Sequence, residues 1–344
     1  MKKVLELHNL THNYDPRTTA GISDINISIR ESEIVSLIGP SGSGKSTTLK
    51  CVANIISNYK GEINIEKDEE VAYVDQHPNL NDNESVFENI KNAIKGNVTE
   101  SQAETQIRTS LSNLELTNEI HSKISQLSGG QKQRVIIAQA LVNNPSILLL
   151  DEPFANLDNI LRASLLEELF SLFKEKSITV LWVTHNTDEA LSYSDRIMLL
   201  NFGKVQQIDT PYSIFNRPNN LFTASFFGES NIYVSKVFNT DESSNYYVNI
   251  LDYKFPIINK DIITKSLNEL LVVIPPNTIT ISKNGNLKGT VERSKYYGSH
   301  ALIELSVESQ YIWIKYNPLN TVYKTGDFVT FSLDYNFFHY LGEV

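Results

Sequence analysis

Hydrophobic and polar positions follow two different patterns along this 344-residue chain. Over residues 3–10 and 22–30 they alternate one by one, which is typical of strands with one buried face. The turn-rich DPRTTAG lies between these segments, so we expect them to pair as antiparallel strands. Segments 33–38, 146–151 and 178–185 are instead almost continuously apolar, as strands buried on both faces of a parallel sheet are.

Segments with helical spacing separate these strands. We expect regular helices at 46–57, 159–175 and 187–193. Residues 85–126 also keep helical spacing, and the Gly-Gly turn of LSGGQKQRVIIAQAL (127–141) opens a further helix. Strands that alternate with helices predict an α/β fold with a mostly parallel sheet covered on both faces, and a helical insertion at about 78–140.

Four shorter strands complete this part of the chain. We expect two at 61–66 and 71–76, and two at the edge of the sheet at 196–201 and 204–209.

The pattern changes after about residue 217. We interpret RPNNLFTASFFGESN (217–231) as a connector, after which short strand-like runs follow one another between turn signals. Eleven of the sixteen tyrosines lie beyond residue 230, and we interpret them and Trp313 mainly as core residues and cross-strand pairs. The sequence therefore predicts two domains, an α/β domain at 1–228 and a small all-β, OB-like barrel at 229–344.

Charge and cysteine content narrow the function. The net charge is −10, with 20 Lys and Arg against 28 Asp and Glu in residues 1–228, which argues against a nucleic-acid-binding protein. The single cysteine, Cys51, falls within an apolar helical pattern and allows no intrachain disulfide. The N-terminus MKKVLELHNL enters a strand without a signal-peptide pattern, and no apolar run is long enough to span a bilayer. We expect a cytoplasmic protein.

The stretch GPSGSGKST at 39–47 fits the phosphate-binding pattern G-x-x-x-x-G-K-[ST], between an apolar strand and a helix. An ordinary Gly/Ser loop is the alternative, but the flanking strand and helix favour a nucleoside triphosphate site. Lys45 is expected to reach the outer phosphates and the Ser46 hydroxyl to bind Mg²⁺. The residues expected to hold the nucleotide here are Gly39, Pro40, Ser41, Gly42, Ser43, Gly44, Lys45, Ser46 and Thr47.

Two acidic residues end the strand 146–151, at the edge where open α/β sheets bind ligands. Asp151 is a candidate for the Mg²⁺ shell and Glu152 for the base that deprotonates attacking water. His185 ends the next central strand, where it can contact the terminal phosphate. The other histidines show no metal-ligand spacing, so we expect no metal other than nucleotide-bound Mg²⁺.

The LSGGQ segment supplies a second helix start with anion-binding character, at Ser128, Gly129, Gly130 and Gln131. One cradle already satisfies one triphosphate. A second phosphate-binding end makes sense if it serves a nucleotide held by another copy of the chain.

Taken together, residues 1–228 resemble an ABC transporter ATPase. The matches are the cradle, Gln76 as the Q-loop, LSGGQ as the signature, ILLLDE (147–152), Asn156-Leu157-Asp158 as the D-loop and His185 as the switch histidine. The resemblance implies that Tyr14 stacks on adenine, that Gln76 senses the γ-phosphate and joins the Mg²⁺ shell, and that two copies sandwich two ATP. It also implies that Gln76 and the helical insertion meet membrane subunits.

The FGESN connector and β-rich tail are similar to importers of the ferric-iron, polyamine, sugar and sulfate group, whose tails carry a TOBE-type barrel. The resemblance implies an ATP-hydrolysing subunit at the cytoplasmic face of the membrane. Its expected partners are a second copy, integral membrane permease subunits and, indirectly, an extracytoplasmic solute-binding protein. Ferric iron or a polyamine is the expected solute. Asn186 departs from the group, where Asp is common.

Three alternatives stay open on the sequence. A soluble, non-transport ABC ATPase usually carries paired cassettes or basic tails. A nucleotide-gated regulatory subunit without turnover would not need Glu152 and His185. An exporter would usually carry its membrane domain in the same chain or lack the β tail.

Overall fold

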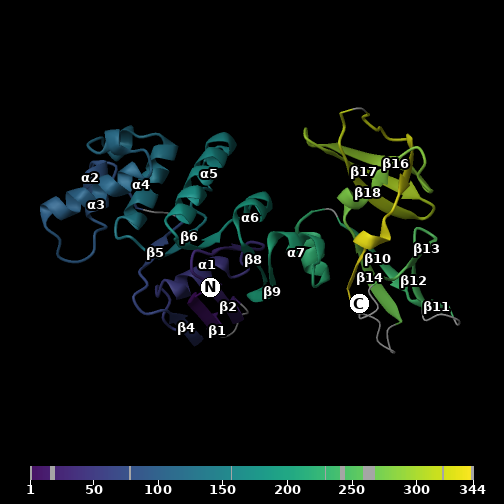
Figure 1. The fold of residues 1–344 in the computed structure, drawn as a ribbon, viewed down its shortest axis with the longest axis horizontal. Coiled ribbons are helices and arrows are strands. Elements are labelled where there is room, and N and C mark those ends of the chain that lie inside the picture. Colours follow the sequence, from purple (N-terminus) through teal and green to yellow (C-terminus); the bar gives the residue numbers. More distant parts are fainter. Residues whose placement is uncertain are drawn as a thin grey trace. The chain divides into compact units, whose positions relative to one another are not determined.

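The computed structural model describes residues 2–15, 20–76, 79–155, 157–228, 230–240, 245–258, 268–319 and 321–341. Contacts divide the chain into two compact units, Met1–Pro211 and Tyr212–Val344. In Figure 1 the first unit runs from purple to teal and the second from green to yellow.

A six-stranded sheet forms the centre of the first unit, in the order β5-β6-β7-β3-β8-β9. All neighbours are parallel except β8 and β9, which confirms the mostly parallel sheet. The strands are β3 (Ile34–Ile38), β5 (Val71–Val74), β6 (Ile147–Asp151), β7 (Thr179–Val183), β8 (Arg196–Asn201) and β9 (Lys204–Asp209). The prediction that 196–201 is an edge strand was wrong. β8 lies between β3 and β9, and its central residues from Ile197 to Leu200 are fully buried.

A second, antiparallel sheet contains β1 (Lys3–Asn13), β2 (Gly21–Arg30) and β4 (Lys60–Ile65) in the order β2-β1-β4. The predicted pairing of the first two strands is confirmed, with Leu7 opposite Ile27. Their apolar side chains share a core with residues of β3, β6, β7 and β8, so this sheet is packed against the central one.

Three helices connect the central strands: α1 (Lys45–Val52), α5 (Asn159–Glu175) and α6 (Thr187–Tyr193). The last two have the predicted bounds. α1 ends at Val52 rather than at the predicted residue 57. The cause is the backbone at Asn54, whose φ of 56° lies in the left-handed region and cannot continue a helix.

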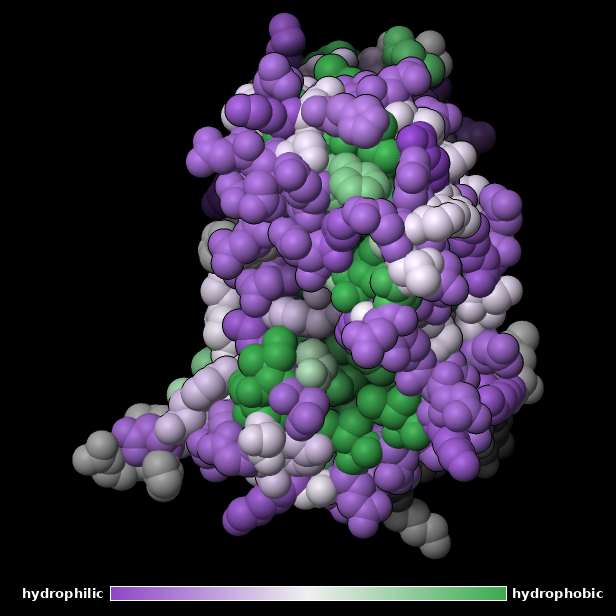
Figure 2. Space-filling model, turned by 90° about the vertical axis from the view of Figure 1, so that its left-hand side faces the viewer, coloured by the Kyte–Doolittle hydropathy of each residue, from purple (hydrophilic) through white to green (hydrophobic). Residues whose placement is uncertain are grey.

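The helical insertion contains α2 (Val86–Lys91), α3 (Glu100–Ser112) and α4 (Gly129–Leu141), with short 3₁₀ turns at Thr117–Glu119 and Ile124–Gln126. Each of the three helices begins with a capping box. Their apolar faces join the core formed by α5 and the central strands. Figure 2 views the side of the molecule on which α2 and α3 lie, where apolar side chains gather in the middle and lower part of the face with polar ones around them.

The segment expected to be a connector is partly helical, with α7 (Pro211–Asn216) and α8 (Leu221–Phe226). The compact units divide at residue 211, before the predicted boundary at 228. The reason is packing, since Ala224 of α8 shares a small core with Leu271, Val273 and Leu341 of the β domain. His339 Nε2 also lies 2.7 Å from the Pro218 carbonyl oxygen.

The rest of the second unit, where the structure describes it, consists of three antiparallel sheets around one core, as predicted, with short 3₁₀ turns at Pro276–Thr278 and Tyr335–Phe337. The sheets are β10 (Asn231–Lys236), β14 (Glu269–Ile274) and β20 (His339–Leu341); β11 (Phe238–Thr240), β12 (Asn245–Ile250) and β13 (Tyr253–Pro256); and β15 (Thr280–Ile281), β16 (Leu287–Tyr296), β17 (Ala301–Val307), β18 (Gln310–Tyr316) and β19 (Phe328–Ser332). Its tyrosines are of both kinds. Tyr340 is buried in the core, whereas Tyr296, Tyr297 and Tyr311 are exposed.

Candidate nucleotide-binding site

A cleft of about 400 Å³ opens where the carboxyl ends of β3, β6 and β7 meet. It brings together segments that are far apart in the sequence: Tyr14, Ala20, Gly21, Ser41, Gly42, Ser43, Gly44, Lys45, Ser46, Thr47, Gln76, Glu152 and His185. Parallel strands expose their carboxyl ends at one edge of a sheet, so this is where an open α/β sheet receives a ligand. The cleft contains most of the residues that the sequence predicted to contact nucleotide.

The backbone of the cradle requires glycine at two positions. Gly39 has a φ of 146°, and a Cβ there would lie 2.1 Å from the Leu200 carbonyl oxygen. Gly44 has a φ of 101° and precedes α1, which no side chain caps. The first-turn N–H groups of α1 therefore have no side-chain acceptor of their own, which suits a helix start that receives an anion.

Three glycines from distant segments meet beside the cradle. A Cβ on Gly203 would lie 2.5 Å from the Gly21 carbonyl oxygen, and the Gly203 Cα lies within 3.5 Å of the place where a Gly44 Cβ would be. The Gly203 N–H donates to the Ser43 carbonyl at 3.1 Å, and the Gly203 carbonyl accepts from the Ser23 N–H at 2.8 Å. Through these two backbone hydrogen bonds, the turn between β8 and β9 links the cradle to the sheet that contains β1 and β2.

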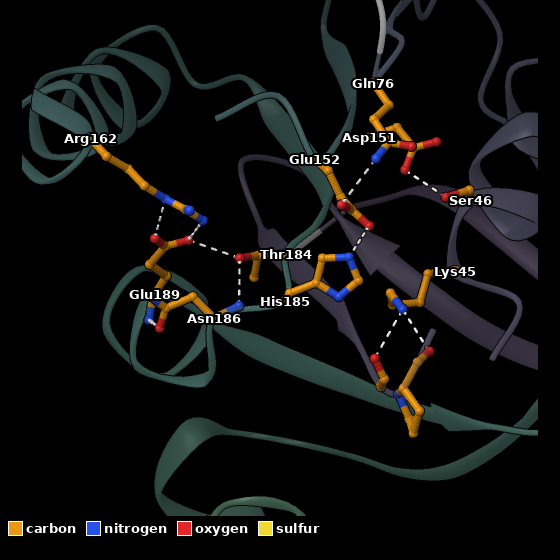
Figure 3. A network of polar contacts seen from close by, with 12 residues as sticks. Lys45, Ser46, Gln76, Asp151, Glu152, Arg162, Thr184, His185, Asn186 and Glu189 are labelled. Atoms are coloured by element: carbon orange, nitrogen blue, oxygen red, sulfur yellow. Dashed lines mark hydrogen bonds and ion pairs between the residues drawn. The ribbon is translucent and has the colours of Figure 1, made fainter. Parts of the chain in front are cut away.

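Lys45 is buried at the floor of the cleft. Its Nζ donates to the carbonyl oxygens of Gly39 and Pro40, each at 2.9 Å (Figure 3). Burial lowers the pKa of Lys45, and the nearby charges of Glu152 and Asp151 oppose that shift. An ammonium whose hydrogen bonds in a buried site go to two neutral carbonyls can gain a stronger partner from an incoming phosphate.

Asp151 is 1% exposed, and both of its carboxylate oxygens accept a hydrogen bond. The Ser46 hydroxyl donates to Oδ1 at 2.7 Å, and the Tyr73 phenol donates to Oδ2 at 3.3 Å. Burial, followed by the charges of Asp151 and Asp75, raises the pKa of Tyr73, so at neutral pH the phenol keeps its proton and acts as a donor. Sequence reasoning missed Tyr73, whose only signal was a tyrosine near the end of a strand beside the acidic one.

Glu152 lies between Gln76 and His185 in the cleft (Figure 3). The Gln76 amide donates to Oε2 at 3.3 Å, and His185 Nε2 lies 2.5 Å from Oε1. The backbone of Glu152 is in the left-handed region at φ 48°, an uncommon conformation for a residue that is not glycine and one that often occurs at functional sites. The structure thus brings the candidate base together with the two residues expected to contact the terminal phosphate.

A second polar cluster supports the loop that carries His185 (Figure 3). Glu189 of α6 accepts from the Thr184 hydroxyl at 2.8 Å and pairs with Arg162 of α5, whose Nε lies 2.6 Å from Oε1. The Asn186 side chain accepts the N–H groups of Asp188 and Glu189 and so caps α6. Asn186 departs from the family pattern, but asparagine is as good a helix cap as aspartate, so the loop geometry is retained.

Tyr14 lies at the rim of the cleft, 59% exposed. Its hydroxyl lies 3.1 Å from the Thr47 Oγ1, and His12 contacts its ring edge-on with ring centroids 4.7 Å apart. An exposed ring that is fixed in place next to a phosphate cradle can offer a flat surface to a base.

The signature residues do not line the cleft. Ser128 caps α4, and Gln131 completes the capping box. Gly130 packs close to Leu161 of α5, where a Cβ would lie 2.9 Å from a leucine methyl carbon. In the D-loop, Asp158 caps α5 by accepting the Leu161 N–H at 3.0 Å, while Asn156 lies outside the described residues.

The donor set fits a magnesium ion. Ser46 Oγ and the Asp151 carboxylate are hard oxygen ligands, within 2.7 Å of each other at the start of a helix and the end of a strand. Mg²⁺ prefers one or two such protein oxygens together with nucleotide phosphates and water.

The cradle, the acidic strand end and the parallel sheet together define a P-loop nucleotide-binding protein. The ABC transporter family model matches residues 22–155. The chain is 34% identical to the spermidine/putrescine import ATP-binding protein PotA of Borreliella afzelii (strain PKo), over 89% of each chain. It is 38% identical to the protein of the same name from Spiroplasma citri, over 86% of each chain.

Among solved structures, the chain resembles the dimeric ATP-binding cassette MJ0796 in a post-hydrolysis state bound to ADP and Pi. The TM-score is 0.52 at 30% identity, with 60% of this chain and 98% of that chain covered. The chain belongs to the ABC transporter family, and the predicted fold class is confirmed. In the part of the chain that the structure describes, no helix has the length and apolar character needed to cross a membrane.

Proposed function

We propose that this protein is the ATP-hydrolysing subunit of a polyamine importer, coupling ATP binding and hydrolysis to the uptake of spermidine or putrescine through separate membrane subunits. The supporting observation is that proteins named spermidine/putrescine import ATP-binding protein match 86–89% of the chain at 34–38% identity. Matches over 86–89% of the chain must include much of the second unit as well as the first, and the names of these relatives favour a polyamine over ferric iron among the solutes expected from the sequence.

The binding roles follow from the cleft. Tyr14 stacks on adenine beside Thr47, and the backbone of residues 39–47 surrounds the phosphates. Lys45 exchanges its bonds to the carbonyls of Gly39 and Pro40 for bonds to the outer phosphates. The ammonium then has a charged acceptor instead of two neutral ones, which strengthens the interaction.

Glu152 is the general base in this proposal. Its carboxylate accepts the proton of the attacking water, and Gln76 and His185, which already contact it, orient it toward the terminal phosphate. Thr184, Glu189 and Arg162 hold the His185 loop in place from the opposite side. Positioning and charge stabilisation of this kind account for most of the rate enhancement in phosphoryl transfer.

Ser46 and Asp151 are the residues that would hold Mg²⁺, with Gln76 as the further ligand expected from the family. When bound, the ion neutralises charge on the phosphates.

Two partners follow from the same proposal. Ser128, Gly129, Gly130 and Gln131 complete the nucleotide site of a second copy, which explains why they lie outside the cleft of their own chain. A second groove of about 550 Å³, lined among others by Ile55, Asn89 and Ile136, lies beside β5 and the helical insertion and is the candidate surface for a membrane permease subunit. The protein would therefore be peripheral, on the cytoplasmic side of the membrane, and a solute-binding protein would complete the importer outside it.

The test uses membrane vesicles that contain the permease subunits of this importer and its solute-binding protein, with the purified protein added back. We expect ATP-dependent uptake of labelled spermidine, and none with Glu152→Gln. Uptake of ferric iron but not of spermidine would contradict the substrate while leaving the ATPase in place. A wild-type protein that binds ATP but does not hydrolyse it would favour the regulatory alternative.

A further inference from the structure

The metal-site carboxylate has a second donor besides Ser46. Asp151 is buried, and Ser46 holds one of its oxygens at 2.7 Å, while the Tyr73 phenol reaches the other at 3.3 Å. A carboxylate held at only one oxygen can rotate about its terminal bond, which changes the direction in which its lone pairs point. A donor on each oxygen removes that freedom.

Strand pairing places the phenol there. Tyr73 on β5 pairs with Leu149 of β6, and Val74 pairs with Leu150. Asp151 therefore lies two residues beyond the register position of Tyr73, on the adjacent parallel strand. The tyrosine side chain is long enough to extend along the strand direction and reach the carboxylate. A shorter hydroxyl side chain such as serine could not span this distance.

The same phenol also faces a competing acceptor. Asp75, two residues further along β5, places its Oδ2 3.4 Å from the Tyr73 hydroxyl. A phenol carries a single hydrogen, so it is shared between two carboxylates at nearly equal distances. Tyr73 thus lies between the carboxylate of Asp151, which contacts Ser46 of the cleft lining, and the carboxylate of Asp75.

We propose that Tyr73 is a positioning residue for the magnesium site, holding Asp151 so that its Oδ1 faces Ser46 and the cleft. The inference rests on the proposed function, since it assigns a partner to a carboxylate that holds Mg²⁺ there. Hydrogen-bond partners of ligating carboxylates fix ligand orientation, and their loss lowers metal affinity. The inference says that Tyr73 acts on the metal through Asp151 and not on the nucleotide directly.

The test compares Tyr73→Phe with Tyr193→Phe. Tyr193 is a matched control, because its phenol also donates to a carboxylate, Glu167, at 3.3 Å, and lies on α6 outside the lining of the cleft. Affinity for the non-hydrolysable ATP analogue AMP-PNP is measured with Mn²⁺ and in EDTA. We expect Tyr73→Phe to lower the affinity roughly tenfold with Mn²⁺, at the low end of the range for such partners because the bond is long. We expect no change in EDTA, and no change in either condition for Tyr193→Phe.

A second measurement separates positioning from a general loss of structure. With ATP saturating, Tyr73→Phe should raise the free Mg²⁺ concentration needed for half-maximal hydrolysis and leave the rate at saturating Mg²⁺ close to that of the wild type. Equal Mn²⁺-dependent affinities in Tyr73→Phe and Tyr193→Phe would overturn the inference, as would a wild-type protein whose AMP-PNP affinity does not depend on metal. Failure of the wild type to bind AMP-PNP in either condition would instead contradict the proposed function.

Discussion

Two helix starts in the first unit are expected to bind phosphate, and they are built differently. α1 follows Gly44, in the left-handed region, and has no side-chain cap. α4 follows Ser128, whose N–H donates to Gln131 Oε1 at 3.0 Å and whose Oγ accepts the Gln131 N–H at 3.3 Å. The first helix start leaves its donors for a ligand, whereas the second satisfies part of its own.

The difference becomes sharper when α4 is compared with α2 and α3, which also begin with capping boxes. The hydroxyls of Ser85 and Thr99 donate to the Glu88 and Gln102 side chains. The Ser128 hydroxyl only accepts, and across the described ranges no acceptor takes its hydrogen. The start of α1 therefore leaves its backbone N–H groups open for the nucleotide proposed to bind in the same chain, whereas α4 is a capped helix whose Ser128 hydroxyl can still donate to the proposed nucleotide of another copy.

The largest expected effect comes from stopping hydrolysis while one nucleotide is held between α1 of one copy and α4 of the other. Glu152→Gln should lower ATP turnover by roughly 10²- to 10⁴-fold, because an amide cannot accept the proton of water. Nucleotide should remain bound, so a dimer should accumulate with ATP on size-exclusion chromatography. Glu167→Gln, on the exposed side of α5, is the control. A Glu152→Gln protein that stays monomeric with ATP would contradict the two-copy site.

Lys45→Ala tests α1 alone. The outer phosphates lose a charged donor, so affinity for ATP should fall roughly 10- to 100-fold, the range expected for one hydrogen bond to a charged group. Fluorescence titration of the monomer measures this directly. Lys50→Ala, on the last turn of the same helix, should leave the affinity unchanged. Unchanged affinity in Lys45→Ala would show that the cradle does not bind through its lysine.

Ser128→Ala tests α4, with Thr99→Ala as its matched control, because both residues cap a helix through the same kind of box. Each substitution should lower the free energy of unfolding by about 1 kcal/mol through loss of the cap. Only Ser128→Ala should lower ATP turnover, by roughly tenfold, since one hydrogen bond to a charged phosphate is lost. Equal turnover in the two variants would mean that Ser128 is a cap and nothing more.

The smallest expected effect concerns Cys51 on the cradle helix. Burial raises the pKa of this thiol to about 11. The folded state therefore keeps the proton at pH values where the unfolded state, with a pKa near that of a free thiol, loses it. The contribution of this thiol to the free energy of unfolding is fully present below the pKa that the thiol has in the unfolded state, and it is lost as the pH rises toward 11. Urea unfolding between about pH 8 and 11 should show this loss in the wild type and not in Cys51→Ala.

Local patterns in the sequence were enough to predict the cradle, the strand that ends in Asp151 and the two helices α5 and α6. Each of these depends on neighbouring residues: a turn that needs glycine, a continuous apolar run, or helical spacing closed by a cap. Those features are determined within a few residues of chain, so they could be recognised without knowing the fold.

The remaining features depend on packing between distant segments. The bond from Tyr73 to Asp151 requires that β5 and β6 be neighbours in a particular register, which no local pattern reveals. The position of β8 also depends on a distant segment, because β3 pairs with the side of RIMLLN that β9 leaves open, and no local pattern indicates this. The helix α8 lies in the segment expected to be a connector, and its Ala224 packs with Leu271 and Val273 of β14 and Leu341 of β20, which come much later in the chain.

The meeting of Gly21, Gly44 and Gly203 has a consequence for how this sequence can evolve. A Cβ on Gly44 or Gly203 would press on residues 21 and 22, and a Cβ on Gly21 would lie 1.9 Å from the His12 carbonyl oxygen, so a side chain at any of the three would displace a neighbouring segment. Substitutions there cannot compensate one another, because each adds volume where none is free. A saturation library selected for function should therefore lose nearly all variants at these three codons together, although they encode three separate loops.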